Sequence, residues 1–268
     1  MTFYELTWYF LIYSVVGWMT EVVFHASFKG NIVNRGFLNG PVCPVYGFGM
    51  IAVISLFNAV GSESFGILFL EGLFLATAVE LVAGFLLDKI FHARWWDYSD
   101  MPLNLNGYIC PAFSVIWGLA VVLVLKTFHK WTEHLVTDLI PPRIGTICLI
   151  VFYILLITDT VVTAMTLIGL NKKLEELDRI ASSLKEVSDK MTDRIGNKAL
   201  KTTQTAQETM IKANLGRAEL EKHAEEIRAS IIKSRHYGAG RMLNVFPGVR
   251  HRDYKEIIKD LQSRLHSM

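Results

Sequence analysis

Carboxylate and histidine side chains recur together near the ends of two apolar segments. Glu21 and His25 close the first apolar run, and Asp88 and His92 close the third. If both runs are helices, each pair is spaced i, i+4 and shares one helix face. A carboxylate beside an imidazole fixes its tautomer and supports its protonated form, so each pair can handle a proton or a cation. The alternative is that each pair only anchors a helix end at the lipid headgroups.

Two more carboxylates interrupt apolar sequence. Glu80 lies two turns before Asp88 on about the same face, and Asp159 falls near the middle of the fifth apolar run. Carboxylates at such depth are costly unless they are paired, protonated or facing a wet interior. They are either functional or buried hydrogen-bonded groups that hold helices together. Glu71 lies nearer the outer edge, and we expect it to be interfacial.

The segments that carry these residues are long and apolar. The chain is 51% hydrophobic, with a mean hydropathy of +0.33, which is too apolar for an ordinary soluble domain. Five runs approach or exceed the roughly 20 residues that cross a bilayer. We therefore expect an all-α membrane protein with about five transmembrane helices in residues 1–170 and a helical tail in residues 171–268. The runs are Phe3 to Phe24, Val42 to Val60, Phe65 to Leu87, Ile109 to Phe128 and Ile144 to Leu170.

The basic residues predict an orientation. No Lys or Arg precedes Lys29, the first link carries Lys29 and Arg35, and the third carries Lys89 and Arg94. A basic tail begins with Lys172, directly after the fifth run. The three basic residues of the fourth link weakly favour the opposite orientation. The positive-inside rule therefore predicts a multi-pass cell-membrane protein with its amino terminus outside and its tail in the cytoplasm.

A nine-residue pattern occurs twice, as "LNGPVCPVY" from Leu38 and "LNGYICPAF" from Leu105. The same offset of 67 residues continues without a gap over about thirty positions. It predicts a parallel internal repeat of two-helix units, at about residues 3–60 and 65–128, with a fifth helix at about 144–170. A shared need for a tight re-entry into lipid is the alternative explanation. The offset aligns Glu21 with Asp88, His25 with His92, Asn39 with Asn106 and Cys43-Pro44 with Cys110-Pro111.

The third link, "ARWWDYSDMPLNLNG", differs from its counterpart in the first unit. Its Trp and Tyr residues suit a membrane interface, but Arg94 and Asp97 require another explanation. We expect these two residues to form an ion pair at the mouth of a cavity between the repeats. The matching segment, "KGNIVNRGFLNG", supplies Arg35 but no aromatic pair.

These stretches also carry a family resemblance. "NRGFLNGPVCPVYGFG" and "HARWWDYSDMPLNLNG" resemble the paired signatures of bacterial membrane proteins known as putative ABC-transporter type IV, or putative ABC transporter permeases. Trp18, Glu21 and Trp117-Gly118 agree with that pattern. The resemblance implies a role in transport without naming a substrate. In that family proline is a more constant feature of the first motif than cysteine, so a thiol function for Cys43 is not implied.

The motifs of several other functions are missing. The chain has no G-x-x-x-x-G-K-[ST] phosphate loop, so ATP-driven transport would need a separate ATPase subunit. It also lacks H-E-x-x-H, C-x-x-C and G-x-S-x-G, and its three cysteines are dispersed. We therefore expect no cofactor and no metal, although His25 and His92 could hold a metal or haem if the repeats pack closely. We also expect no nucleic-acid partner.

The tail has helical periodicity. An apolar seam predicts a coiled coil or helical hairpin that can mediate homo-oligomerisation, followed by a break from Tyr237 and a last amphipathic helix. The basic cluster of Arg241, Arg250, His251 and Arg252 either contacts anionic lipid or forms a solvated face. The seam residues are Leu177, Ile180, Leu184, Val187, Met191, Leu220, Ile227 and Ile231, and the last helix contains Tyr254, Ile257, Ile258, Leu261 and Leu265.

The favoured function is a permease-like transport component that moves a small solute or ion. The alternatives are a membrane-embedded enzyme acting on a lipid-like substrate, and a non-catalytic assembly or sensor protein. We favour a protein without enzymatic activity over an enzyme. The substrate path is expected between the repeats, toward the cytoplasm. Its candidate residues are Glu21, His25, Arg35, Asn39, Glu80, Asp88, His92, Arg94, Asp97, Asn106 and Asp159.

Overall fold

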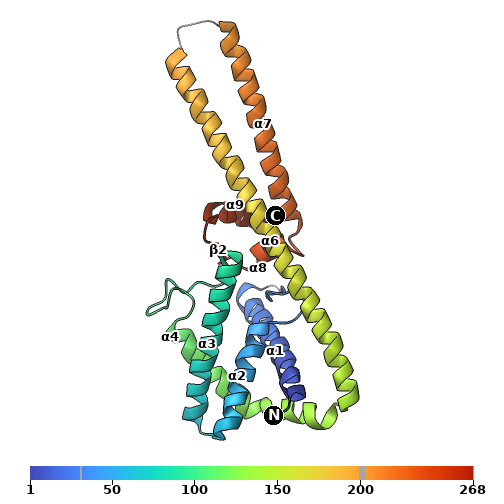
Figure 1. Cartoon of the computed structure of the whole chain (residues 1–268). Coiled ribbons are helices and arrows are strands. Elements are labelled where there is room, and N and C mark those ends of the chain that lie inside the picture. Colours follow the sequence, from blue (N-terminus) through green and yellow to red (C-terminus); the bar gives the residue numbers. More distant parts are fainter. Residues whose placement is uncertain (31, 199–202, 268) are drawn as a thin grey trace. The chain divides into compact units, whose positions relative to one another are not determined.

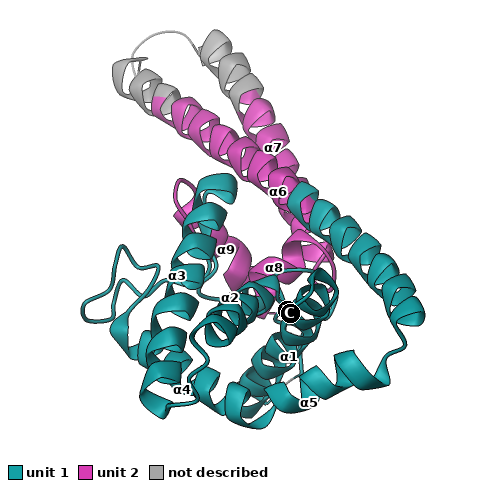
Figure 2. Ribbon diagram, turned by 60° about the horizontal axis from the view of Figure 1, so that its bottom comes forward, with its two compact units in different colours: residues 1–165, 245–250 teal, residues 166–244, 251–268 magenta. Residues whose placement is uncertain are grey.

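The computed structural model describes the backbone of residues 1–30, 32–198 and 203–267, and within them the side chains outside 29, 190–210, 212 and 213. The chain forms two compact units, shown in different colours in Figure 2. The first unit contains residues 1–165 and 245–250, and the second contains residues 166–244 and 251–268. The division lies close to the expected boundary at residue 170, inside one helix.

The first unit is a helical bundle. Its helices are α1 (Phe3–Lys29), α2 (Pro44–Val60), α3 (Phe65–Phe91), α4 (Pro111–Thr127), the short α5 (His129–His134) with a π-helical turn at Leu135–Leu139, and the first part of α6 (Pro142–Lys198). The colours of Figure 1 show that α1 and α3 run in one direction and α2 and α4 in the other. The long connections, residues 30–43 and 92–110, therefore lie at the same end of the bundle.

Local sequence explains where these helices begin and end. Thr2 and Glu5 form a reciprocal capping box at the start of α1, and Gly30 ends that helix with a φ of 74°. Pro44 and Pro111 start α2 and α4, where a missing N–H costs nothing. His92 ends α3 in the left-handed region, with a φ of 54°.

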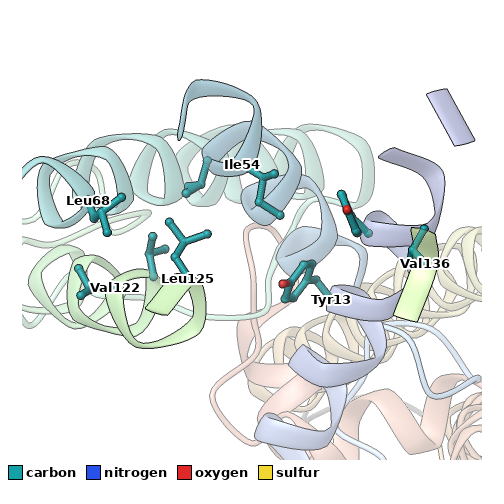
Figure 3. Packing of buried hydrophobic residues seen from close by; sticks show 9 residues of the cluster. Tyr13, Ile54, Leu68, Val122, Leu125 and Val136 are labelled. Carbon is teal, nitrogen blue, oxygen red and sulfur yellow. The ribbon is translucent and has the colours of Figure 1, made fainter. Parts of the chain in front are cut away.

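An apolar core joins α1, α2, α3 and α4. Figure 3 shows Tyr13, Ile54, Leu68, Val122 and Leu125 within it, and Ile54 and Leu68 are almost completely buried. Small residues let the helices approach closely. A methyl group at Gly72 would lie 2.6 Å from Cβ of Val121, and one at Gly118 would lie 2.9 Å from the carbonyl oxygen of Phe69. The α3–α4 contact therefore depends on glycine on both helices.

The helices fit a membrane protein, but the expected count of five spans is not confirmed. By length and composition, α1, α3 and α6 can cross a bilayer, and α4 with the segment His129–Leu139 makes a fourth span if a 51° bend is accepted. At 17 residues, α2 is shorter than a usual span. The two 17-residue helices α2 and α4 begin 67 positions apart, as the repeat predicts. The repeat itself stays a prediction.

The second unit contains the remainder of α6, α7 (Thr203–Lys233), α8 (Ala239–Val245, whose last residue belongs to the first unit) and α9 (Lys255–His266). α6 and α7 lie side by side, because Lys173 donates a hydrogen bond to Ser230 and His223 pairs with Glu176 at 2.9 Å. Four of the predicted seam residues are buried here, and Leu184, Val187 and Leu220 are half-buried, whereas the side chain of Met191 lies outside the described residues. A regular coiled coil stays a prediction. The buried apolar residues include Leu174, Leu177, Ile180, Ile227, Ile231, Leu243, Ile258, Leu261 and Leu265.

Two expectations for the carboxy-terminal region need correction. The break that was expected from Tyr237 contains a seven-residue helix, α8. The basic cluster is not one exposed face, because Arg241 and His251 are each only 4% exposed. Arg252 pairs with its neighbour Asp253, and Arg250 pairs within the first unit, as described below.

Strands are minor in the described part of the chain. β1 (Ala93–Arg94) and β2 (Arg250–His251) form a two-stranded sheet. Arg250, the first residue of β2, belongs to the first unit, as β1 does. An isolated antiparallel bridge joins Leu105 and Ile109 in the third link.

Candidate functional site

Glu21 is the centre of a polar cluster at the end of α1. Its carboxylate accepts a hydrogen bond of 2.6 Å from the hydroxyl of Tyr46, on α2. Arg35, from the first link, places its Nε 3.7 Å from the other carboxylate oxygen and its Nη1 3.1 Å from Nδ1 of His25. Tyr46 approaches so closely because Gly17 faces its ring without a side chain. We call these residues, Glu21, His25, Arg35 and Tyr46, the Glu21 cluster.

Asp88 is the centre of a second cluster at the end of α3. It accepts a hydrogen bond of 2.6 Å from the hydroxyl of Tyr108 and one of 3.0 Å from Nε of Arg94. Arg94 also donates to the carbonyl oxygen of Asn106 and lies over the ring of Tyr108, 4.7 Å from its centroid. Hydrogen bonds from a guanidinium and a phenol satisfy this carboxylate at the end of the helix. Asp88, Arg94 and Tyr108 are the Asp88 cluster.

Glu80 lies deeper in α3 and is only 8% exposed. It accepts hydrogen bonds of 3.0 Å from the hydroxyl of Tyr98 and from the indole N–H of Trp117, on α4. Both donors are neutral, and among the described residues no Lys, Arg or His forms an ion pair with Glu80. Burial, followed by the charge of Glu80, raises the pKa of the Tyr98 hydroxyl, which therefore remains a donor. Glu80, Tyr98 and Trp117 are the Glu80 cluster.

Aromatic rings connect the Glu21 and Glu80 clusters. The ring of Tyr46 meets that of Trp117 edge to face, with centroids 5.7 Å apart. Because Tyr46 contacts Glu21 and Trp117 contacts Glu80, a continuous chain of contacts passes from one acid to the other. Two carboxylates and two aromatic rings in sequence form an environment that can attract a cation.

The third link carries an ionic chain at its surface. The predicted pair of Arg94 and Asp97 is present, with 4.0 Å between its closest atoms, and Arg250 lies 2.8 Å from the other oxygen of Asp97. Burial works to raise the pKa of Asp97, but hydrogen bonds from Ser99 and the two guanidinium groups outweigh it and lower the pKa. Asp100 lies 3.5 Å from Arg250 and is mostly exposed.

Asp159 holds the first link. Its two oxygens accept hydrogen bonds from the backbone amides of Asn39 and Gly40, at 3.1 and 2.7 Å, and from the side-chain amide of Asn39 at 2.9 Å. Thr163, one turn later on α6, bonds to both Asp159 and Asn39. This arrangement favours the structural alternative for Asp159, because it satisfies the turn of the first link.

The predicted residues therefore separate into several groups. Glu21, His25 and Arg35 come together, as do Asp88, Arg94, Asp97 and the carbonyl of Asn106, whereas Asn39 joins Asp159. His92 ends α3, where its backbone amide donates to the carbonyl of Asp88. The i, i+4 side-chain pairs stay predictions.

Sequence reasoning missed the hydrogen-bond donors. Tyr46, Tyr98, Tyr108 and Trp117 bond directly to the acids, but they were interpreted as markers of the repeat, of the family pattern or of the membrane interface. The phenol groups of Tyr98 and Tyr108, on the polar third link, were an available signal. His129 was also missed, and Nδ1 of this buried ring lies 3.0 Å from the hydroxyl of Tyr13.

A metal site is not found in the part of the chain that the structure describes, where no group of three or more His, Cys, Asp or Glu side chains is arranged to hold an ion. Cys43 and Cys110 are buried at the starts of α2 and α4, and Cys148 is partly buried on α6.

Comparison with known protein families matches residues 8–164 to the family described as "Putative ABC-transporter type IV". The match covers more than half of the chain, including all three acid clusters, so the protein belongs to this family of membrane proteins. Comparison with curated proteins and with solved structures found no match.

Proposed function

We propose that the chain is the membrane-embedded, permease-like component of a transporter that moves a small solute or ion. The observation that supports this most directly is Glu80, a buried carboxylate on a membrane-length helix whose described hydrogen-bond partners are neutral. Burying such a charge is costly, and it is retained where a pathway or binding site needs it. Family membership supports the same function.

The path would pass between the Glu21 and Glu80 clusters. Tyr46 and Trp117 connect the two acids, and the Asp88 cluster borders them at the end of the same helix as Glu80. Because the sequence has no phosphate-binding loop, ATP-driven transport would require a separate ATPase subunit. Homo-oligomerisation through the tail and contact with membrane lipid belong to the same proposal.

Replacing Glu80 tests the function. In the natural host, metabolites inside and outside the cells are profiled for the wild type, a deletion strain, Glu80→Gln and the exposed control Glu63→Gln. We expect Glu80→Gln to reproduce the deletion profile at normal protein level, because an amide keeps the size of the acid but loses its charge. Glu63→Gln should match the wild type. A wild-type profile for Glu80→Gln would contradict the proposal.

The orientation is part of the proposal, with the amino terminus outside and the tail in the cytoplasm. A thiol introduced as Ser183→Cys, at an exposed position on α6, is offered to a membrane-impermeant maleimide in whole cells. We expect reaction only after the cells are opened. Equal reaction in intact cells would place the tail outside.

A further inference from the structure

Glu71 differs from every other acid of the membrane unit described above. It lies in the first third of α3 and is only 7% exposed, a burial inside the protein that its expected interfacial position did not predict. In the described part of the chain, neither of its carboxyl oxygens has a hydrogen-bond partner. Glu80, nine residues later and equally buried, has two donors.

Glu71 is flanked on α3 by apolar residues. Leu68 lies one turn earlier on the same helix and is 1% exposed, while the adjacent Gly72 packs directly on Val121 of α4. The helices that pack against α3 are α2 and α4. α2 contains no Asp, Glu, Lys, Arg or His, and α4 contains only Lys126, which is exposed in its last turn. Neither helix supplies a buried charge to balance a carboxylate.

A proton is the ligand that fits such a site. An ionised carboxylate without donors in an apolar interior is far more costly than the neutral acid. A metal cation would need several oxygen ligands, and among the described residues no group of three or more His, Cys, Asp or Glu side chains gathers to hold one. One proton on either oxygen removes the charge without any further ligand.

We propose that Glu71 is a proton-binding site in the half of α3 that lies away from the Glu21, Asp88 and Glu80 clusters. The nine residues between Glu71 and Glu80 correspond to about 13.5 Å along the helix axis, so the two acids are separate sites. The proposal does not depend on Glu80 carrying substrate. If the chain is a transporter, it makes the proton a candidate for the coupling ion.

Infrared spectroscopy tests the protonation directly. The carbonyl stretch of a neutral carboxyl group is separate from the bands of a carboxylate, and it shifts in deuterium oxide. We expect purified full-length protein at neutral pH to show this band and Glu71→Gln to lose it. Glu71→Gln replaces a neutral acid by a neutral amide of the same size and should fold normally. An unchanged band in Glu71→Gln would overturn the proposal, as would a wild-type protein without the band.

Chemical labelling locates the proton along the chain. A carbodiimide takes the proton of a neutral acid, and the resulting carboxylate adds to its central carbon, so the whole reagent stays on the protein without a leaving group. Peptide mapping by mass spectrometry should find lipid-soluble dicyclohexylcarbodiimide on Glu71 before Glu80, and Glu80→Gln should leave the Glu71 adduct unchanged. Preferential labelling of Glu80, or equal labelling of Glu71 by a water-soluble carbodiimide, would show that Glu71 is not a neutral acid in an apolar site. These outcomes do not depend on the metabolite profile of Glu80→Gln.

Discussion

The Glu21 and Asp88 clusters both hold a carboxylate near a helix end with a tyrosine and an arginine, but their distances and exposure differ. In each, a carboxylate near the end of a 27-residue helix accepts a 2.6 Å hydrogen bond from a tyrosine and approaches an arginine from the following link. The Arg94–Asp88 distance is 3.0 Å, whereas the Arg35–Glu21 distance is 3.7 Å. The side chain of Asp88 is 11% exposed and that of Glu21 is 31% exposed.

The difference shows that a sequence pattern that occurs twice does not fix the side chains that complete a site. Tyr46 lies on α2, whereas Tyr108 precedes α4, so the two tyrosines are not related by the 67-residue offset. The tightly held Asp88 suits a structural role at the end of α3. Glu21, which is more exposed and less closely paired, is the better candidate to meet a ligand.

The largest expected effect separates the two acids by their contribution to stability. Asp88→Ala should lower the free energy of unfolding by about 3–4 kcal/mol, because it leaves Arg94 and the Tyr108 hydroxyl without their carboxylate. Glu21→Ala should cost about 1–2 kcal/mol, since its ion pair is longer and more hydrated. Unfolding in a denaturing detergent measures both.

The exposed Glu63→Ala is the matched control for this pair, and it should change the free energy of unfolding by less than about 0.5 kcal/mol. An equal loss of unfolding free energy for Asp88→Ala and Glu21→Ala would contradict the distinction between Asp88 as a structural acid and Glu21 as an acid that can meet a ligand.

A smaller effect is expected at the glycines that face the two tyrosines. A methyl group at Gly17 would overlap the ring of Tyr46, so Gly17→Ala should cost about 2 kcal/mol and displace the hydroxyl from Glu21. At Gly84 the nearest atoms of Trp96 and Tyr108 lie 3.2 Å away, and Gly84→Ala should cost less than about 1 kcal/mol. Thermal unfolding of both variants measures which substitution destabilises the protein more. A larger loss of stability for Gly84→Ala than for Gly17→Ala would contradict this prediction.

The smallest effect concerns the ionic chain that only the third link possesses. Because the pKa of Asp97 is lowered in the folded protein, its contribution to stability is complete above the usual aspartate pKa of about 4 and is lost as the pH falls below it. Asp97→Asn should remove this contribution, about 1 kcal/mol. Unfolding curves at pH 7 and at acidic pH test it.

Asp100→Asn is the control for the ionic chain, since Asp100 meets the same Arg250 but is mostly exposed. The Asp97→Asn difference should shrink at acidic pH, whereas Asp100→Asn should have little effect throughout. A loss for Asp97→Asn that stays constant between the two pH values would mean that Asp97 acts through packing.

The sequence predicted the features that depend on local spacing. Apolar run length predicted α1, α3 and α6, which are long enough to cross a bilayer, and the Cys-Pro pairs of the twice-occurring pattern lie at the starts of α2 and α4. The ion pair between Arg94 and Asp97, three residues apart, was predictable for the same reason. The 51° bend after α4 was not predicted, since the polar residues that follow Phe128 indicated a link, whereas the structure continues there as α5 and the π-helical turn.

The contacts between distant segments could not be predicted in this way. Spacing indicated that Glu80 was buried, but its donors lie on α4 and in the third link, where helix packing brings them together. The burial of Glu71 was not predicted for a related reason. Spacing along the sequence does not show that α3 packs against α2 and α4, and this packing buries Glu71.

The clamp between Asp159 and the first link has a consequence for biosynthesis. The amides of Asn39 and Gly40 receive their carboxylate from a residue about 120 positions later in the chain. Asp159 leaves the ribosome only after the five preceding helices, α1 to α5, and domains fold while synthesis proceeds. During translation, therefore, the amides of the first link lack the Asp159 carboxylate as their hydrogen-bond acceptor. Nascent chains that stop before Asp159 should be the forms that membrane proteases recognise as unfinished.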